Sequence, residues 1–422
     1  MRRLIVALCL LAGFVPHPAK SADLAIACSA LGVEFRLCRD GVQAWAHATG
    51  NRVTIVSTPN AATERLALYQ QLLAAGSPDI DVLQIDVIWP ATLSRHLADL
   101  RPFIDQSTVR RHFPAMIAND TVQGRLVAMP WFAGAGMLYY RNDLLEKYGF
   151  HPPRTWDDLT HFANAIQRQE RAQGHTRMWG FVFQAKAYEG LTCNALEWIA
   201  SSGGGTIVAP DGAITVDNPD AAHALTRAAG WVGTIAPTGV LNYAEEDARG
   251  VFQSGNAVFM RNWPYAWALG NAEGSPVKDR IGVMPLPAGS GLDGKPAGTL
   301  GGAQLAVSRY SRHPGLAAAL VRYLTSPDEQ KRRAIQGSYN PTIPALYDDP
   351  EVLAANPFFA TMRDILSHAV ARPATVTGTR YNQVSAAVFN AVHDVLSGSR
   401  SAPDSLAALH RRLQRLSRGG AW

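Results

Sequence analysis

Aromatic and acidic side chains stand where several predicted strands end. Trp263 follows the apolar run AVFMR, Asp86 closes the run DVLQI, and Trp131 with Phe132 follows RLVAMP. Flat rings stack on the apolar face of a pyranose, and charged groups hydrogen-bond its rim of hydroxyls. Ligands of open α/β sheets lie at the carboxyl ends of strands, so these positions can converge on one crevice. The pattern indicates sugar-binding chemistry.

The usual signatures of catalysis are missing. The sequence has no G-x-S-x-G elbow, no H-E-x-x-H and no Walker loop. Glu245 and Glu246 are adjacent, as are Asp157 and Asp158, and adjacent residues on a helix do not face the same point. Thr155, which stands before two of these acids, is typical of a helix N-cap. We therefore expect no catalytic residues, no metal site and no cofactor.

The elements that must position the aromatic and acidic residues alternate along the chain. Two β-rich runs, at 52–59 and 79–90, flank a segment in which Leu66, Tyr69 and Leu73 share one helical face. This is a βαβ pattern, which predicts an α/β fold. Single cores stop growing at about 250 to 300 residues, so a chain of 422 residues predicts two lobes.

The first 22 residues differ from the rest. Arg2 and Arg3 precede an apolar run from Leu4 to Val15 and a small-residue exit, which is the pattern of a secretory signal peptide. We expect cleavage and a periplasmic location. Removal of the segment lowers the formal net charge from +5 to +2, and the remaining basic residues are scattered. The chain therefore has no nucleic-acid signature.

Three cysteines remain after residue 22. Cys28 and Cys38 are ten residues apart and could close a small loop in an oxidising compartment. A metal site would need further ligands nearby, and the sequence has none there. We predict a disulfide between these two residues and a buried free thiol at Cys193.

Six segments, in order along nearly the whole chain, carry a resemblance to a known family. The chain resembles extracellular solute-binding proteins (family 1) of carbohydrate ABC importers, in the branch of trehalose- and maltose-binding proteins. The segments are CSALGVEFRLCRDGVQAWAHATG, PWFAGAGMLYYRNDLLEKYGFHPPRTWDDL, YEGLTCNALEW, FQSGNAVFMRNWPYAW, GTLGGAQLAVS and SYNPTIPALY.

This resemblance implies a class II periplasmic-binding-protein-like fold, with two α/β lobes that close around a ligand by a hinge. We expect 23–133 with 285–340 in the N-terminal lobe and 134–284 with 341–422 in the C-terminal lobe. The resemblance also implies a ring that stacks on the sugar, acidic acceptors, basic donors and closely approaching glycines. The implied ligand-binding residues are Glu34, Arg65, Asp86, Phe132, Glu245, Trp263, Gly301, Gly302 and Arg372.

Simpler roles compete with these assignments. Trp263 could be a core ring, Asp86 could cap the turn that follows it, and Arg65 could be a charge on the surface of a helix. Glu34 and Arg372 face the same alternatives.

The sequence also departs from the family. Relatives often have bulkier or more polar residues where this chain has Phe132, Gly134, Ala303 and Gly378. We therefore expect a roomier and less polar pocket, in which trehalose is not bound in the familiar way and a longer or differently substituted sugar fills the space.

The resulting hypothesis is a monomeric, non-enzymatic receptor that delivers a carbohydrate to a membrane permease with its cytoplasmic ATPase. Two alternatives remain open. A secreted glycoside-acting enzyme would need two carboxylates about 5 to 9 Å apart on either side of the bond to be cleaved. A binding protein for a non-sugar solute would not depend on stacking by Trp263.

Overall fold

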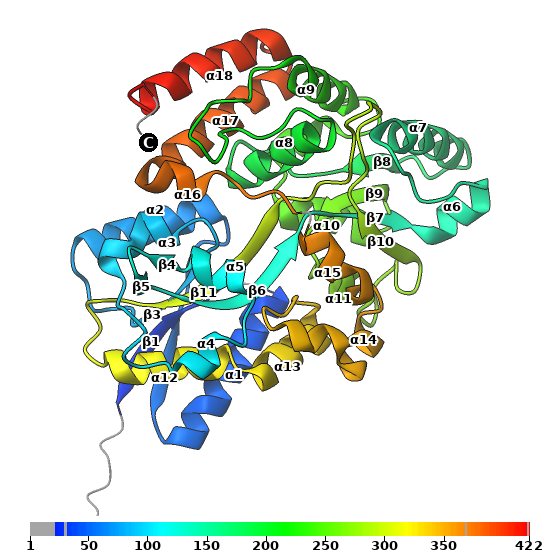
Figure 1. Cartoon of the computed structure of the whole chain (residues 1–422). Helices are drawn as coiled ribbons and strands as arrows, with labels where there is room; N and C mark the ends of the chain where they lie inside the picture. The colour runs from blue at the N-terminus through cyan, green and yellow to red at the C-terminus, as the bar shows by residue number, and fades with distance from the viewer. Residues whose placement is uncertain (1–21, 29–31, 368, 420–421) are drawn as a thin grey trace, which may run out of the picture.

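The computed structural model describes residues 22–28, 32–367, 369–419 and 422 of the chain. These residues form two lobes, and each lobe is built on its own β-sheet (Figure 1). We call the lobe with the five-stranded sheet lobe 1 and the lobe with the four-stranded sheet lobe 2. The predicted α/β fold with two lobes is confirmed. The predicted signal peptide lies outside the described residues, except for Ala22.

The sheet of lobe 1 has the strand order β2-β1-β3-β11-β6. The first three strands of this order are parallel, whereas β11 runs antiparallel to both of its neighbours. The five strands are β1 (Asp23–Ala27), β2 (Arg52–Val56), β3 (Val82–Asp86), β6 (Met129–Ala135) and β11 (Leu300–Val307).

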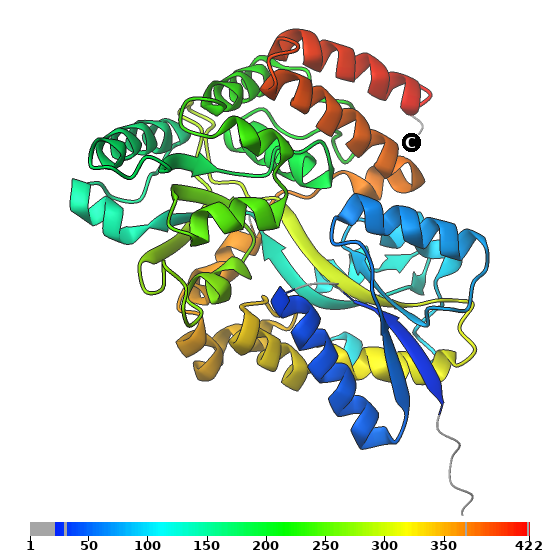
Figure 2. The same cartoon turned by 180° about the vertical axis from the view of Figure 1, so that it is seen from behind.

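Helices cover both faces of this sheet (Figures 1 and 2). The helix predicted between the two β-rich runs is α2, and Leu66, Tyr69 and Leu73 are its buried residues, as expected. A short hairpin and a 3₁₀ turn complete the lobe. These elements are α1 (Gly32–Thr49), α2 (Ala62–Ala74), α3 (Pro90–Leu93), η1 (Ser94–His96), α4 (Gln106–Val109), α5 (Pro114–Asn119), β4 (Thr121–Val122), β5 (Arg125–Leu126), α12 (Pro314–Leu324) and α13 (Pro327–Gly337).

The sheet of lobe 2 has the order β10-β7-β9-β8, in which only β8 and β9 are parallel. The strands are β7 (Met137–Arg141), β8 (Trp179–Val182), β9 (Ala257–Asn262) and β10 (Ile281–Pro285). The helical elements after β7, other than those of lobe 1, are α6 (Asn142–Tyr148), α7 (Trp156–Ala172), α8 (Glu189–Ser201), α9 (Pro219–Trp231), η2 (Thr238–Asn242), α10 (Glu245–Gln253), α11 (Ala266–Gly270), η3 (Pro344–Asp348), α14 (Pro350–Ala355), α15 (Phe359–Ser367), α16 (Ala374–Thr377), η4 (Gly378–Arg380), α17 (Tyr381–Leu396) and α18 (Ala402–Leu416).

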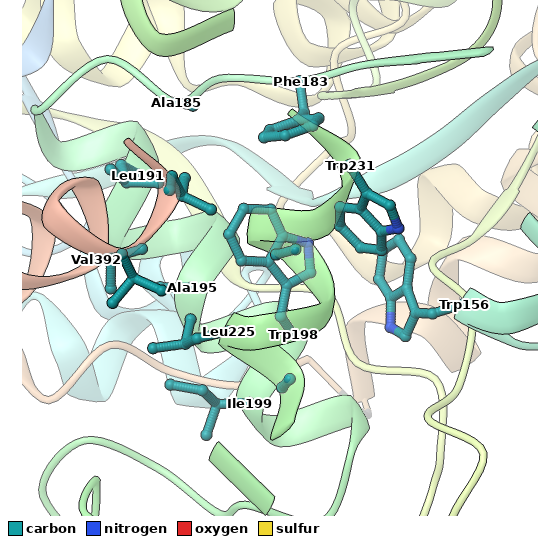
Figure 3. Packing of buried hydrophobic residues seen from close by; sticks show 14 of the residues in the cluster. Trp156, Phe183, Ala185, Leu191, Ala195, Trp198, Ile199, Leu225, Trp231 and Val392 are labelled. Atoms are coloured by element: carbon teal, nitrogen blue, oxygen red, sulfur yellow. The ribbon is translucent and has the colours of Figure 1, made fainter. Parts of the chain in front are cut away.

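Large aromatic side chains fill the core of lobe 2. Trp156, Trp198 and Trp231 pack together beside Phe183, and the ring centroids of Trp198 and Trp231 are 5.8 Å apart (Figure 3). The buried indole of Trp231 donates a hydrogen bond to Thr160 at 2.8 Å, so its polar group is satisfied. This core packs helices of lobe 2 against the four-stranded sheet.

Local sequence signals account for several element ends. Thr155 and Asp158 form the capping box at the start of α7, as predicted, so the paired acids there serve the helix and not catalysis. The predicted lobe boundaries stay a prediction. One of them, at residue 133, falls inside β6, and α14 packs on α13 of lobe 1, where Asn356 donates to the carbonyl of Ala334.

Candidate functional site

A cavity of about 240 Å³ lies between the two lobes. Its lining comes from the ends of β3, β6 and β11, the N-termini of α1, α2, α8 and α10, and the turn after β9. All nine residues that were expected to bind a ligand lie in this lining. They are Glu34, Arg65, Asp86, Phe132, Glu245, Trp263, Gly301, Gly302 and Arg372.

Trp263 follows β9 directly and is partly exposed to the cavity, so it is not a core residue. The guanidinium carbon of Arg261 lies 4.0 Å from the centre of its ring and covers one face. Its indole nitrogen donates to Glu245 at 3.3 Å, and its carbonyl oxygen accepts a bond from the hydroxyl of Tyr139 at 2.9 Å. These contacts, all within lobe 2, fix the orientation of the indole.

Arg261 is itself held by a buried ion pair. Its side chain and that of Glu197 are 1% and 0% exposed, and Nε of Arg261 donates to Glu197 at 2.9 Å. Burial alone would lower the pKa of Arg261, but the Glu197 carboxylate outweighs burial and raises it. Glu197 also accepts the backbone N–H of Thr299 at 3.0 Å, which ties the pair to the segment before β11.

Gly301 and Gly302 line the cavity, but packing within the protein explains why they lack side chains. A Cβ atom at Gly301 would lie 2.7 Å from Cζ3 of Trp263. At Gly302, where φ is +132°, a Cβ atom would lie 2.3 Å from the carbonyl oxygen of Phe132. From the sequence, we expected a ligand to approach the two glycines closely. In the structure, the indole of Trp263 occupies the space beside Gly301, and the backbone of β6 occupies the space beside Gly302.

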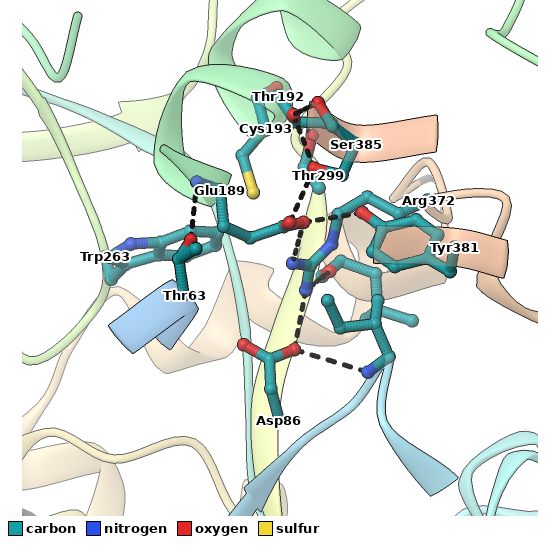
Figure 4. A network of polar contacts seen from close by, with 12 residues as sticks. Thr63, Asp86, Glu189, Thr192, Cys193, Trp263, Thr299, Arg372, Tyr381 and Ser385 are labelled. Atoms are coloured by element: carbon teal, nitrogen blue, oxygen red, sulfur yellow. Dashed lines mark hydrogen bonds and ion pairs between the residues drawn. The ribbon is translucent and has the colours of Figure 1, made fainter. Parts of the chain in front are cut away.

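Arg372 is the centre of a polar network that joins the lobes (Figure 4). It donates to Asp86, at the end of β3 in lobe 1, at 3.0 Å, and to Glu189, at the start of α8 in lobe 2, at 2.8 Å. Glu189 also accepts hydrogen bonds from Tyr381 at 2.5 Å and Ser385 at 2.6 Å. The expected acceptor Asp86 and the expected donor Arg372 are therefore partners of each other.

The pKa of Glu189 reflects the balance in this network. Burial raises the pKa of its carboxyl above the ordinary value, and the opposing effects of Arg372, Ser385 and Tyr381 only partly offset it. Burial alone would lower the pKa of Arg372, but the nearby carboxylates of Asp86 and Glu189 help to raise it above its ordinary value. Asp86 also accepts the backbone N–H of Ile88 at 3.3 Å, so it caps the next turn while it faces the cavity.

Glu34 and Arg65 complete the side of the cavity formed by lobe 1. Glu34 lies in the first turn of α1 and accepts a bond from the side-chain amide of Gln84 at 2.6 Å. Arg65 lies on α2, partly buried, with its guanidinium carbon 5.9 Å from the centre of the Trp89 ring. Arg65 is therefore a partly buried residue of the cavity lining and not an exposed charge on the helix surface.

A disulfide fastens the turn that carries Glu34. Cys28, after β1, is bonded to Cys38 in α1, and their Cα atoms are 6.5 Å apart. Cys193 is free and buried, as predicted, and burial raises the pKa of its thiol. The disulfide therefore anchors the start of α1, where Glu34 meets the cavity.

Two sequence expectations need correction. Trp131 was expected at a strand end that faces the crevice, but β6 begins at Met129 and directs Trp131 into the core of lobe 1, where it is 1% exposed beneath Arg333. Gly378 was expected to enlarge the pocket, but it begins η4 outside the cavity lining. Gly134 and Ala303 do line the cavity.

Sequence reasoning missed several lining residues. The ring of Tyr265 in lobe 2 is stacked on that of Tyr339 in lobe 1, with centroids 6.4 Å apart, and its hydroxyl donates to Glu246 at 2.7 Å. Tyr265 follows Trp263 by two residues in the same turn, and this closeness in the sequence could have identified it as a lining residue. Glu189 and Tyr188 gave no such signal, because only the fold brings α8 to the cavity.

Two features were not found in the part of the chain that the structure describes. Within it, no group of three or more His, Cys, Asp or Glu residues could hold a metal ion. Among the same residues, no helix has the length and apolar character of a membrane span.

Comparisons with known proteins agree with this geometry. The family model of bacterial extracellular solute-binding proteins matches residues 39–331. A probable ABC transporter-binding protein of Deinococcus radiodurans is 54% identical over 405 residues, which is 96% of each chain. Maltose-bound MalE3 of T. maritima is 38% identical, with a TM-score of 0.89, over 94% of this chain and 100% of that one.

A more distant structure supports the fold alone. An ABC transporter solute-binding protein from Agrobacterium vitis S4, solved with D-mannitol, is 20% identical with a TM-score of 0.80, over 95% of this chain and 99% of that one. The family model covers well over half of the chain, and the Deinococcus protein is similar over almost its full length. The chain therefore belongs to the family of bacterial extracellular solute-binding proteins.

Proposed function

We propose that this solute-binding protein captures a carbohydrate between its lobes and delivers it to the membrane permease of an ABC transporter. The observation that carries the proposal is the placement of Trp263. Its ring is partly exposed in a cavity whose lining holds Glu34 and Asp86 from lobe 1 and Glu245 from lobe 2. An indole beside carboxylates suits a pyranose, which has one apolar face and a rim of hydroxyls.

The remaining charged residues complete the recognition of hydroxyls. In this proposal Glu34 and Asp86 accept hydrogen bonds from the sugar, while Arg65 and Arg372 donate to it. The ion pair between Asp86 and Arg372 holds both side chains at the edge of the cavity. Charge-assisted hydrogen bonds of this kind are about twice as strong as neutral ones.

The comparisons support a sugar as the solute class. MalE3 of T. maritima carries maltose, and the two proteins are similar over the whole of that chain. With the predicted signal peptide at 1–22, we propose that the protein is exported, processed and active in the periplasm as a monomer. Closure of the lobes around the sugar forms the surface that the permease recognises, which requires tighter binding to the closed state.

A thermal-shift screen over mono-, di- and oligosaccharides tests the proposal. A ligand at a hundred times its dissociation constant adds about 2.7 kcal/mol to the free energy of unfolding, so a true solute gives a clear shift. Trp263→Ala is expected to abolish this shift. Trp267→Ala is the matched control, because Trp267 packs on Phe358 outside the cavity lining and should leave the shift intact.

Two outcomes would count against the proposal. An unchanged shift in Trp263→Ala would remove stacking as the basis of binding and favour a non-sugar solute. Release of sugar products during incubation would favour the alternative of a glycoside-acting enzyme, since a receptor binds its solute in a fixed ratio without turnover.

A further inference from the structure

The aromatic wall of the cavity in lobe 1 is built over a buried arginine. Phe132 of β6 and Tyr339, just after α13, both line the cavity, and their rings meet edge to face with centroids 4.7 Å apart. The guanidinium carbon of Arg333 lies 4.7 Å from the ring centre of Tyr339 and 5.3 Å from that of Phe132. It lies closer still, at 3.8 Å, to the ring centre of the core residue Trp131. One cation therefore contacts three rings, two of which face the cavity.

Arg333 is unfavourably buried. It is 1% exposed, and within the described part of the chain none of its three side-chain nitrogens has a hydrogen-bond partner. Burial lowers its pKa to about 10, and the attraction of Glu34 and Glu329 offsets this only in part, so the side chain is a cation at neutral pH. A buried cation without hydrogen bonds lowers the stability of a fold. Stability alone therefore does not account for Arg333.

The arginine behind Trp263 in lobe 2 is held differently. The guanidinium carbon of Arg261 lies 4.0 Å from the centre of the Trp263 ring, and its charge is paired with the buried carboxylate of Glu197. Arg333 has no ion pair of this kind among the residues that the structure describes. Both walls of the cavity thus have a guanidinium behind an aromatic ring, and the one in lobe 1 is held by rings alone.

The backbone at the end of α13 is strained as well. Ser338 is buried, lines the cavity and has a φ of +55°, in the left-handed region that residues other than glycine rarely adopt. Its N–H donates to the carbonyl of Ala334 at 2.9 Å, and the N–H of Tyr339 donates to the carbonyl of Arg333 at 3.5 Å. The chain therefore turns at Ser338 and brings the Tyr339 ring back beside the guanidinium. Backbone strain of this kind clusters at binding sites.

Two unfavourable features, a cation without hydrogen bonds and a left-handed serine, coincide at one wall of the cavity. We propose that Arg333 is a positioning residue for solute binding, which fixes the rings of Phe132 and Tyr339 so that lobe 1 presents a rigid aromatic wall to the solute. Arg333 does not itself line the cavity, so it acts through these rings. The inference rests on the proposed function and deepens it by assigning a role in binding to a residue outside the cavity lining.

Arg333→Met tests the inference, because methionine keeps an unbranched stem without the charge. Removal of an unpaired buried cation should leave the free energy of unfolding equal to or above that of the wild-type protein. Calorimetry with maltose, and with the sugars that the thermal-shift screen selects, should show affinity at least about tenfold weaker, which corresponds to about 1.4 kcal/mol. A purely structural residue would give the opposite result, with lower stability and normal affinity of the folded protein.

Two further variants sharpen the comparison. Arg333→Lys should recover part of the affinity, because its ammonium keeps the attraction to the rings but lacks the planar guanidinium. Arg227→Met is the matched control. Burial also lowers the pKa of Arg227, which lies on α9, donates to Ser202 at 2.9 Å and is absent from the cavity lining. Whatever its effect on stability, Arg227→Met should leave sugar affinity unchanged.

A mutant cycle tests whether Arg333 acts through the two rings. In the Phe132→Ala/Tyr339→Ala background, Arg333→Met should weaken sugar binding further by less than about twofold, because the rings that it positions are gone. An equal loss of affinity in this background and in the wild-type protein would overturn the inference.

The remaining outcomes separate this inference from the proposed function. Normal affinity in Arg333→Met would overturn the role of Arg333 while carbohydrate binding stands. If Arg333→Met does not fold, wild-type affinity in Arg333→Lys would count against the planar guanidinium in the same way. If no sugar of the screen binds the wild-type protein, the proposed function fails, and the role of Arg333 fails with it.

Discussion

The two ends of the main cavity are held in different ways. At one end, Trp263 is fixed by Arg261, Glu245 and Tyr139, all of which belong to lobe 2. At the other end, Arg372 connects Asp86 of lobe 1 to Glu189 of lobe 2. One end is thus assembled within a lobe, and the other is assembled between lobes.

A hinge motion between the lobes would therefore affect the two ends of the cavity differently. The hydrogen bonds of Trp263 and its contact with Arg261 all lie within lobe 2, so they can hold the ring in its orientation when the lobes separate, although its packing against Gly301 of β11 would change. The pair between Arg372 and Asp86 breaks if the lobes move apart. Stacking is therefore pre-organised, whereas the polar end forms on closure, and pre-organisation lowers the entropic cost of binding.

The largest expected effect comes from breaking the support behind Trp263. Glu197→Met leaves the guanidinium of Arg261 buried without its carboxylate, and loss of one partner of a buried pair costs about 3–5 kcal/mol. Chemical denaturation should therefore show a large fall in the free energy of unfolding.

The double variant Glu197→Met/Arg261→Met separates stability from positioning. It leaves no buried charge at this site, so it should recover most of the stability, while sugar affinity stays low because the indole has lost the group behind it. A double variant as unstable as the single one would show that the unpaired charge is not the cause.

Arg372→Met should have a smaller effect that depends on pH. The variant leaves Glu189 with Tyr381 and Ser385 as donors, and we expect a cost of about 2–3 kcal/mol above neutral pH. The pKa of Glu189, already raised by burial, should rise further without the opposing charge. A raised native pKa contributes stability below the ordinary glutamate pKa, and this contribution is lost as pH rises through the native value.

The deficit of Arg372→Met relative to the wild-type protein should therefore be larger at about pH 8 than at about pH 5. In Arg372→Met/Glu189→Gln, which has no carboxyl at position 189, the contribution of Glu189 to the pH dependence is removed, so the deficit should change less between about pH 5 and about pH 8 than in the single variant; Asp86 remains in both variants. Small-angle scattering should show a more open molecule in both variants, because the tie to Asp86 is gone. A pH-independent deficit in the single variant would remove Glu189 as its source.

The sequence predicted the parts of the site that local patterns determine. The apolar run before Trp263 and the strand that ends at Asp86 placed both residues correctly at the cavity, because the end of a strand is a local feature. The buried face of α2 followed from helical spacing in the same way. The resemblance, and not local pattern, indicated Glu34, Arg65 and Arg372.

Partners that are distant in the sequence could not be predicted. Glu189 precedes Arg372 by 183 residues, and nothing in the sequence of α8 marks it as a neighbour of that guanidinium. Trp131 was misplaced because one residue of register decides which face of a strand meets the core. The glycines were predicted at the cavity, but only coordinates could show that the indole uses their space.

The smallest effect concerns one of those glycines. Gly301→Ala places a methyl group 2.7 Å from the Trp263 ring, so the ring must shift, and overpacking of this kind costs about 1–3 kcal/mol. Sugar affinity should fall together with stability. Gly250→Ala is the control, since Gly250 lies exposed within α10 and an added methyl group would meet nothing within 4 Å, and alanine there should stabilise the helix by about 0.5–1 kcal/mol. If Gly301→Ala were as stable as Gly250→Ala and bound sugar normally, the ring would be mobile, and the contrast between a fixed end and a closing end would lose its basis.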